Sequence, residues 1–192
     1  MASPATLSAT QLLRQRHKEI EDLFTRTLAA SGDERRELFD CLRATLAVHE
    51  TTEEMFVHPL GRRVGGDKGE RVVEDRLAEE REATKSLKDL EDLGPDGDQF
   101  ATRLTMFQRA VHEHAEKEEH ELFPLIDAEC SQQDLANLAD AILAGEQLAP
   151  THAHPHAGQN PLALMIVGPF AAMVDKSRDH FTSWMRGRNK NN

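Results

Sequence analysis

Two stretches of this chain carry the same spacing of side chains that bind metal ions. Both read H-x3-E-E-x4-P, and the two copies comprise His49, Glu53, Glu54 and Pro59, and His114, Glu118, Glu119 and Pro124. On a helix, residues four apart lie on one face, with about 5–6 Å between their β-carbons. Each copy therefore presents an imidazole beside a carboxylate. Two such helices that face each other can hold a pair of metal ions.

The neighbouring residues favour a buried site over a surface hydrogen bond, the usual role of an isolated His-x3-Glu pair. In both copies the His and the Glu occupy positions of an otherwise apolar helical stripe. The first stripe is Leu38, Leu42, Leu46, His49, Glu53 and Phe56, and the second is Leu104, Phe107, Val111, His114, Glu118, Leu122 and Leu125. Burying ionisable groups costs free energy unless something compensates them. A shared metal site supplies that compensation.

Four amphipathic segments must position these pairs. The chain has 192 residues without a tyrosine, and Ala, Leu, Glu and Arg dominate it, which favours helices. The spacing of apolar residues predicts helices over about 8–28, 34–57, 70–93 and 99–126, with Pro59 helping to end the second and a connection over 61–69. Short connections predict an all-α, up-down-up-down four-helix bundle, which we assign to residues 9–145.

The remaining segments lie outside the four helices. We expect a disordered tail over 1–8, a short helix over 131–145 and a polar tail over 187–192. Between them, residues 146–186 form a C-terminal extension, with a His-rich loop and an apolar helix over 162–185. In the loop, His154 and His156 are candidates for a missing ligand or a proton donor, although such loops are most often only polar.

The other two helices offer one candidate ligand each. His17 lies on the core stripe of the first helix, between Leu13 and Ile20. Glu80 is the ionisable residue on the stripe of the third helix, with Glu79 as the fallback; Glu80 could instead pair with an arginine such as Arg81 or Arg14. His58 and His120 lie off the stripes, and we expect them to be solvated, while His112 lies two residues from His114, on a different face of the helix.

The predicted metal ligands are thus His17, His49, Glu53, Glu80, His114 and Glu118. Three imidazoles and three carboxylates suit two iron ions with bridging carboxylates and an oxo or hydroxo bridge. Zinc and manganese accept the same ligands.

This arrangement resembles the hemerythrin-like (HHE cation-binding) proteins over roughly residues 10–127. The resemblance implies a four-helix bundle around a non-haem di-iron centre. Carried over by motif, it makes ligands of His17, His49, Glu53, His114 and Glu118. The segment after the bundle resembles an extension found in actinobacterial members.

The third helix departs from the family pattern. Most relatives have a His there and the oxygen carriers have two, but residues 77–85 contain none and place Glu80 where the His is expected. A carboxylate adds negative charge, which stabilises Fe(III) over Fe(II) and lowers the potential. We therefore expect a redox-active protein that handles peroxide, oxygen or nitric oxide, with catalase-like peroxide breakdown as one concrete form.

Two other readings stay open, and composition narrows the partners. The chain could be a non-enzymatic iron or oxygen sensor that signals through its C-terminal extension, or a metal-free structural bundle. A formal net charge of −11 argues against nucleic acid and anionic membranes as partners. No apolar stretch is long enough for a membrane span, and no secretory signal or disulfide framework is evident, so we expect a cytoplasmic protein. Its oligomeric state, monomer or dimer, is open.

Overall fold

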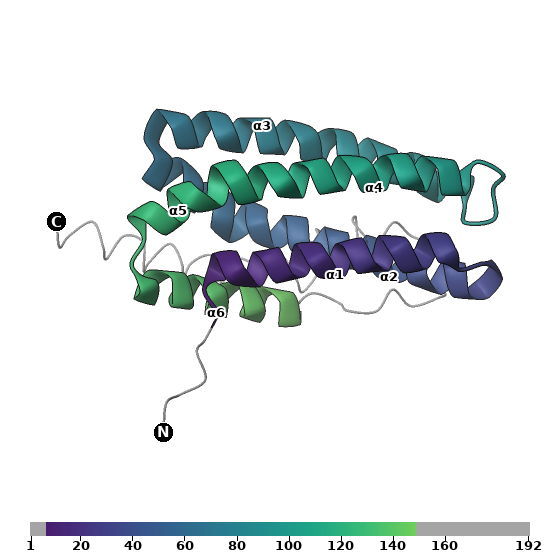
Figure 1. Cartoon of the computed structure of the whole chain (residues 1–192), viewed down its shortest axis with the longest axis horizontal. Coiled ribbons are helices and arrows are strands. Elements are labelled where there is room, and N and C mark those ends of the chain that lie inside the picture. Colours follow the sequence, from purple (N-terminus) through teal and green to yellow (C-terminus); the bar gives the residue numbers. More distant parts are fainter. Residues whose placement is uncertain (1–6, 149–192) are drawn as a thin grey trace, which may run out of the picture.

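Long helices run side by side and antiparallel in the computed structural model of the chain, which describes residues 7–148 (Figure 1). With η marking a π-helical turn, the elements are α1 (Ala9–Ala29), α2 (Gly32–Thr52), η1 (Glu53–Val57), α3 (His58–Leu93), α4 (Phe100–Lys117), η2 (Glu118–Leu122), α5 (Phe123–Glu129) and α6 (Gln132–Leu148). The predicted all-α four-helix architecture is confirmed.

Helix α1 begins where the sequence offers a cap. The Ser8 hydroxyl accepts a hydrogen bond from the Gln11 backbone N–H, and the Gln11 side chain accepts one from the Ser8 backbone N–H. This reciprocal pair satisfies two N–H groups that the first helical turn leaves unpaired. The helix then buries Leu13, Ile20 and Phe24 along one face, with His17 between them.

The predicted end of the second helix at Pro59 and the predicted connection over 61–69 are both wrong. The helix continues through η1 into α3 and breaks at Gly66, where φ is 53° and ψ is −140°. A side chain at Gly69 would place its β-carbon 2.2 Å from the Gly61 carbonyl oxygen, so the two arms of the break pack at a distance only glycine allows. The charged and glycine-rich composition marked a sharp bend between helices and not a loop.

Both prolines of the repeated motif follow a π-helical turn. The His58 backbone N–H donates to the Glu53 carbonyl oxygen, and the Phe123 N–H donates to that of Glu118, five residues back in each case. A proline inside an α-helix has no N–H to donate, and its ring collides with the carbonyl four residues earlier. Widening the preceding turn accommodates the ring, so the chain passes each proline without ending the helix.

Two apolar clusters fill the bundle on either side of a polar layer. One cluster packs α1 and η1 against α5 and α6, and its largest side chains are Leu13, Phe56, Leu122, Phe123, Ile126 and Leu138. The other lies toward the opposite end and centres on Phe24, Phe39, Leu42, Leu90, Phe100 and Leu104. On α1, His17 lies between Leu13 of the first cluster and Ile20 of the second, which places it in the polar layer.

Helix α6 extends the bundle beyond four helices. Its Leu135, Leu138 and Ile142 are buried in the first apolar cluster, and Glu146 accepts two hydrogen bonds of 2.7 Å from Arg16 of α1. The predicted His-rich loop with His154 and His156, the helix over 162–185 and the polar tail lie outside the described residues. None of the helices within residues 7–148 is both long and apolar enough to cross a membrane.

Candidate metal centre

The six predicted ligand side chains meet in the polar layer. They come from six different elements, namely His17 from α1, His49 from α2, Glu53 from η1, Glu80 from α3, His114 from α4 and Glu118 from η2. Each is at most 9% exposed, and both Glu53 and Glu118 are completely buried. The structure therefore brings together every residue that the two apolar stripes and their neighbours predicted.

The spacing of the donor atoms fits shared metal ions. The His49 Nε2 lies 3.3 Å from the Glu53 Oε2. The Glu118 Oε2 lies 3.4 Å from the His17 Nε2 and 3.6 Å from the His114 Nε2. Two atoms that each lie about 2.1 Å from one ion are about 3.0–3.4 Å apart at octahedral or tetrahedral angles. These pairs are longer than normal N–H···O hydrogen bonds, so they match ligands around an ion better than hydrogen-bonded partners.

Many of these buried atoms have no hydrogen-bond partner among the described residues. They are the Nε2 atoms of His17 and His114 and both carboxylate oxygens of Glu53, Glu80 and Glu118. An unsatisfied buried polar group costs about 1–3 kcal/mol, and more when it is charged. The alternative pairing of Glu80 with an arginine does not occur, because neither of its oxygens accepts a hydrogen bond. A cation coordinated by these atoms would remove the cost, so the donor set fits a metal.

His58 joins the cluster, and the prediction that it is solvated is wrong. It is 3% exposed, with Nε2 3.5 Å from the Glu80 Oε1 and 3.7 Å from the Glu118 Oε1. Neither of its ring nitrogens has a hydrogen-bond partner in the described part of the chain. The π turn adds a residue to the helical repeat and rotates His58 inward. The signal was present in the sequence as a His five residues after Glu53 and directly before a proline.

Glu50 is the second residue that sequence reasoning missed. Its carboxylate, that of Glu53 and the His114 imidazole bring ligand atoms within 4.8 Å of one another. Glu53 also belongs to a second group of this kind, because a ligand atom of Glu53 and those of His17, His49 and Glu118 lie within 4.8 Å of one another. Glu50 directly follows His49 and does not belong to the apolar stripe, so counting along the stripe does not find it.

His17 is held in one orientation by a carboxylate of the repeated motif. The His17 Nδ1–H donates to the Glu119 Oε1 at 2.8 Å, and Arg14 donates to the other Glu119 oxygen at 2.5 Å. Because Nδ1 carries the proton, the Nε2 lone pair points into the cluster. Glu119 is therefore an orienting partner, placed just outside the cluster.

The same arrangement recurs at His114 with a carboxylate from another helix. The His114 Nδ1 donates to the Glu79 Oε2 at 3.1 Å, and the Glu79 Oε1 also accepts from the buried Arg76 at 3.0 Å and from Lys117 at 2.5 Å. Glu79 was the fallback for Glu80, yet its carboxylate points to the outer nitrogen of His114. Glu80 is the carboxylate of α3 that lies in the cluster.

Burial and mutual charge shift the pKa values of the carboxylates in opposite directions. Burial and the neighbouring Glu118 raise the pKa of Glu53, and burial and Glu50 raise the pKa of Glu80 to about 8. For Glu118, burial acts in the same sense, but the His17 and His58 imidazoles outweigh it and lower its pKa. Without metal, the cluster thus favours the ionised form at Glu118 and the protonated form at Glu53.

The pKa values of the imidazoles also shift in opposite directions. Burial and the neighbouring His17 lower the pKa of His49 to about 3. Burial also acts against charge on His114, but the hydrogen bond to Glu79 and the charge of Glu118 raise its pKa to about 9. A neutral His49 has a free lone pair, whereas His114 must lose a proton before its Nε2 can bind a cation.

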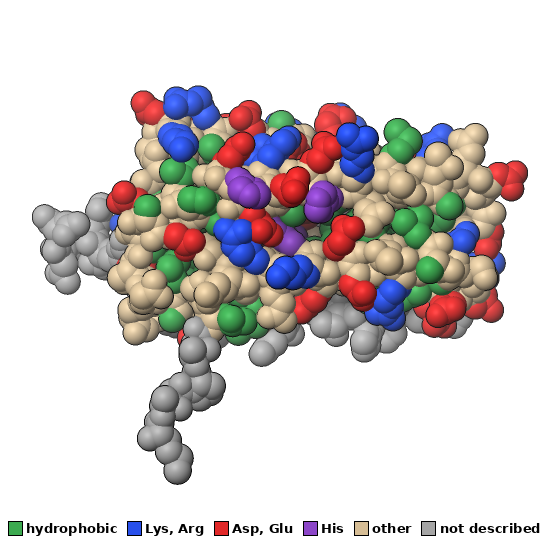
Figure 2. Space-filling view, in the orientation of Figure 1, with side chains coloured by type: hydrophobic (Ala, Val, Ile, Leu, Met, Phe, Trp, Pro, Cys, Tyr) green, Lys and Arg blue, Asp and Glu red, His purple; other side chains and the backbone are tan. Residues whose placement is uncertain are grey.

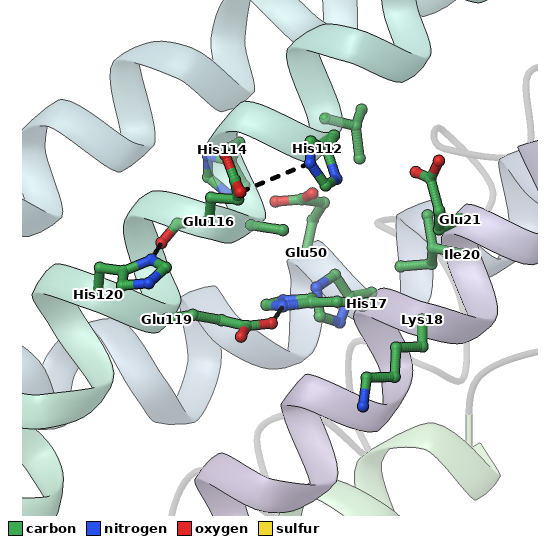
Figure 3. A pocket seen from close by; sticks show the side chains of 13 residues that line it. His17, Lys18, Ile20, Glu21, Glu50, His112, His114, Glu116, Glu119 and His120 are labelled. Carbon is green, nitrogen blue, oxygen red and sulfur yellow. Dashed lines mark hydrogen bonds and ion pairs between the residues drawn. The ribbon is translucent and has the colours of Figure 1, made fainter.

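A cavity of about 260 Å³ connects the cluster to the surface between α1 and α4. His17, His49 and His114 lie along it, together with the exposed His112 and His120 (Figure 3). The prediction that His120 is solvated is confirmed. On this face of the molecule, histidine and acidic side chains gather over α4 and beside α1 (Figure 2). A second cavity of about 360 Å³ opens between α3 and α4 and reaches Glu50, Glu80 and His114.

Comparisons with known proteins agree with this geometry. Residues 8–126 match the model of the Hemerythrin HHE cation binding domain. An uncharacterized hemerythrin-like protein of Schizosaccharomyces pombe is 26% identical over 139 residues, which cover 72% of this chain and 68% of that protein. The crystal structure of a Hemerythrin HHE cation binding domain-containing protein from Mycobacterium kansasii superposes with a TM-score of 0.67 at 18% identity, covering 89% of this chain and 99% of that one.

The fold and the buried imidazole–carboxylate cluster define a helical cation-binding bundle. Because the family model spans more than half of its length, the chain belongs to the Hemerythrin HHE cation-binding family. The M. kansasii structure supports the shared fold alone.

Proposed function

We propose that the chain binds two non-haem iron ions in this cluster and uses them to react with peroxide, oxygen or nitric oxide. The observation that carries the proposal is the set of buried, unpaired imidazole and carboxylate atoms at ligand spacing around Glu53 and Glu118. A structural bundle without metal would leave all of these groups uncompensated. Zinc and manganese would satisfy the same atoms, so the identity of the metal is part of what the experiment decides.

The donor atoms divide into two sets around the shared carboxylates. His17 and His49 group with Glu53 and Glu118, and they would hold one ion. His58 lies against Glu80 and Glu118, and His114 groups with Glu50 and Glu53 and also lies against Glu118; together these residues would hold the second ion. This division gives the second set more carboxylates than the first and uses His58 in place of the imidazole that α3 lacks.

The carboxylate content favours reaction over reversible carriage of oxygen. Glu80 and Glu50 add negative charge beside the second set, and anionic oxygen ligands stabilise the oxidised metal. Iron bound here would supply a redox couple to a small ligand. The chain itself contributes the positions of the imidazoles, which Glu119 and Glu79 fix, and a cavity that admits small molecules while the apolar clusters exclude water from both ends.

The test is the metal content and the near-ultraviolet and visible spectrum of the chain from iron-supplied cells, native and as Glu80→Ala. About two irons per chain with an oxo-to-iron charge-transfer band support the proposal. Glu80→Ala is expected to lose or distort that band, whereas Glu82→Ala, an exposed neighbour on α3 paired with Lys85, should leave it intact. Stoichiometric zinc or manganese, or a folded chain without metal after reconstitution with ferrous iron, would overturn the assignment of iron.

Reactivity is measured on the same preparation. Consumption of peroxide, or a spectral change with peroxide, oxygen or nitric oxide, is the expected result, and its absence in the iron-loaded chain would contradict the proposed reactivity. The sensor alternative predicts metal-dependent protection of residues 146–186 from proteolysis without turnover. Turnover without a change in the protection of that segment would favour the enzyme.

A further inference from the structure

A buried arginine contacts the carboxylate that orients His114. Arg76 belongs to α3, which lies beside α4 (Figure 1), and it is 3% exposed. Its Nη2 donates to the Glu79 Oε1 at 3.0 Å, and its Nε lies 2.9 Å from the Glu79 Oε2. The guanidinium thus presents one flat edge to both oxygens of a single carboxylate, the geometry that restrains a carboxylate most. Glu79 cannot turn away from His114 without losing both contacts.

The third nitrogen of Arg76 reaches another element. Its Nη1 donates to the Glu121 Oε2 at 3.2 Å, and Glu121 belongs to the π turn η2. The guanidinium therefore joins α3 to η2, and through Glu79 it also reaches His114 of α4. These three elements supply three of the ligands proposed for the second ion. One side chain outside the cluster thus connects the parts of the fold that must hold those ligands in register.

Stability alone does not explain the burial of Arg76. A buried charge costs free energy, and a buried ion pair often stabilises a fold no more than apolar side chains of the same volume would. The carboxylates that face Arg76 are partly exposed, at 28% for Glu79 and 49% for Glu121, so water could solvate both. What the guanidinium adds is a fixed direction, because its planar set of donors fits few orientations of a carboxylate.

The other cations that contact the orienting carboxylates are more exposed. Lys117 donates to the Glu79 Oε1, but its side chain is 45% exposed and carries a point charge on a flexible stem. Arg14 donates to one side-chain oxygen and to the carbonyl oxygen of Glu119, and its side chain is 36% exposed. Water screens exposed ion pairs, which contribute little. We therefore expect Arg76 to restrain its carboxylate more than Lys117 or Arg14 does.

We propose that Arg76 is a positioning residue for the second ion, which holds Glu79 against the His114 Nδ1 and thereby aims the His114 Nε2 into the cluster. The inference rests on the proposed function, because it concerns a ligand of an ion bound there. Arg76 acts through Glu79, since a guanidinium carries only donors and cannot bind a cation itself. Its loss should weaken the binding of the second ion and leave the ion beside His17 and His49 in place.

The first test is a nuclear magnetic resonance measurement on the metal-free full-length chain with isotope-labelled histidine. The Nδ1–H protons of His114 and His17 are each held by a carboxylate, so they should exchange slowly with water and give separate signals, which His114→Gln and His17→Gln assign. Arg76→Gln should lose the His114 signal to fast exchange and keep that of His17. Arg81→Gln is the matched control, because it removes an exposed arginine of the same helix, and it should keep both signals.

The pattern of loss separates positioning from a general loss of structure. Loss of the His114 signal alone supports the inference, and retention of both signals refutes it. If Arg76→Gln loses both signals or does not fold, Arg76→Lys decides, because it keeps the charge and the apolar stem without the planar set of donors. Arg76→Lys should weaken the His114 signal alone. Equal loss or retention of both signals in this variant would mean that Arg76 only supports the fold, which refutes the inference.

The second test titrates the same metal-free chains with Co(II) and follows the visible absorbance. The native chain should take up two ions. Arg76→Gln should bind one of them about tenfold more weakly, the lower end of the usual cost of losing a partner outside the ligands, and Arg81→Gln should bind both as the native chain does. Native affinity for both ions in Arg76→Gln would refute the inference and leave the proposed function standing. If the native chain takes up no Co(II), the proposed function fails and the inference fails with it.

Discussion

The two copies of the repeated motif agree at their inner positions and differ at their outer ones. In both, the first Glu is completely buried and a π turn precedes the proline. The second Glu differs, since Glu54 is exposed while Glu119 binds His17 and Arg14. The residue before the proline differs as well. His58 enters the polar cluster, whereas Phe123 stacks on His17 with ring centroids 5.8 Å apart.

This difference shows that the inner His and Glu of the motif form the metal-binding cluster, whereas the outer positions make different contacts in the two copies. The inner His and Glu must be duplicated, because two ions need matched ligands on facing helices. The outer positions face different neighbours, and each copy uses them accordingly. In copy two, Glu119 lies against His17 of α1 and orients it, while in copy one His58 lies against Glu80 of α3 and supplies an imidazole that α3 lacks.

The largest expected effect comes from the two shared carboxylates. Glu53→Gln and Glu118→Gln should each lose at least one bound ion per chain, because each carboxylate lies against imidazoles of the cluster. The loss should also remove the stabilisation that metal confers, about 4 kcal/mol at a free metal concentration a thousand times the Kd. Metal analysis and thermal unfolding with and without metal measure both quantities. If either variant retained two ions, Glu53 and Glu118 would not be equivalent as ligands. Glu54→Gln, which changes an exposed carboxylate of the same motif, is the control.

The next effect tests the residue before the proline. His58→Phe gives copy one the residue of copy two, and it should weaken metal binding. In the metal-free chain the substitution removes two buried, unpaired ring nitrogens, which is favourable, but also an imidazole that lowers the pKa of Glu118. The melting temperature should therefore fall more in the metal-loaded chain than in the metal-free chain. His58→Leu repeats the test without the larger ring, and unchanged metal affinity in both variants would exclude His58 as a ligand.

The inner positions were predictable from the sequence, because they need only the helical period. His49, Glu53, His114 and Glu118 interrupt apolar stripes, and so do His17 and Glu80, so counting by 3.6 residues per turn finds all six. His58 and Phe123 follow the π turns, where that period fails by one residue. Pro59 was read as a helix end, since a sequence does not reveal whether a proline is accommodated by a wider turn.

The outer contacts depend on tertiary structure and could not be predicted. Glu119 and Glu54 occupy the same motif position and have the same local sequence pattern. What distinguishes them is that α1 places His17 and Arg14 beside one of them. Glu50 likewise became part of the cluster only through its approach to His114 from another helix.

The orienting carboxylates should give an intermediate effect. Glu119→Gln is expected to weaken metal binding by about 10–100-fold, the usual cost of losing a partner that fixes a histidine ligand. Glu54→Gln, at the same place in the other copy, should leave the affinity unchanged. Competition with a metal chelator measures both constants. Equal effects of the two substitutions would mean that Glu119 acts through surface charge and not through its hydrogen bond to His17.

The smallest expected effect separates Glu53 from Glu118 in the metal-free chain. The pKa of Glu53 is raised, so its contribution to stability is present below its ordinary value of 4.5 and is lost as pH rises through the folded value. The pKa of Glu118 is lowered, so its contribution is present above 4.5 and is lost as pH falls. Glu80 behaves like Glu53, with a folded pKa of about 8.

Between pH 6.5 and 8, Glu80 and His114, with folded pKa values of about 8 and about 9, should therefore make the metal-free chain lose stability with rising pH, by on the order of 1 kcal/mol per pH unit for each such proton. Glu53→Gln mimics the protonated side chain of Glu53 and should make the slope less steep with little cost. Glu118→Gln should lower the stability at neutral pH and leave the slope in place. Urea unfolding at a series of pH values gives both slopes. If the two variants show the same stability and the same pH slope, Glu53 and Glu118 do not differ in charge in the metal-free chain. The difference between the two carboxylates would then arise only when metal binds.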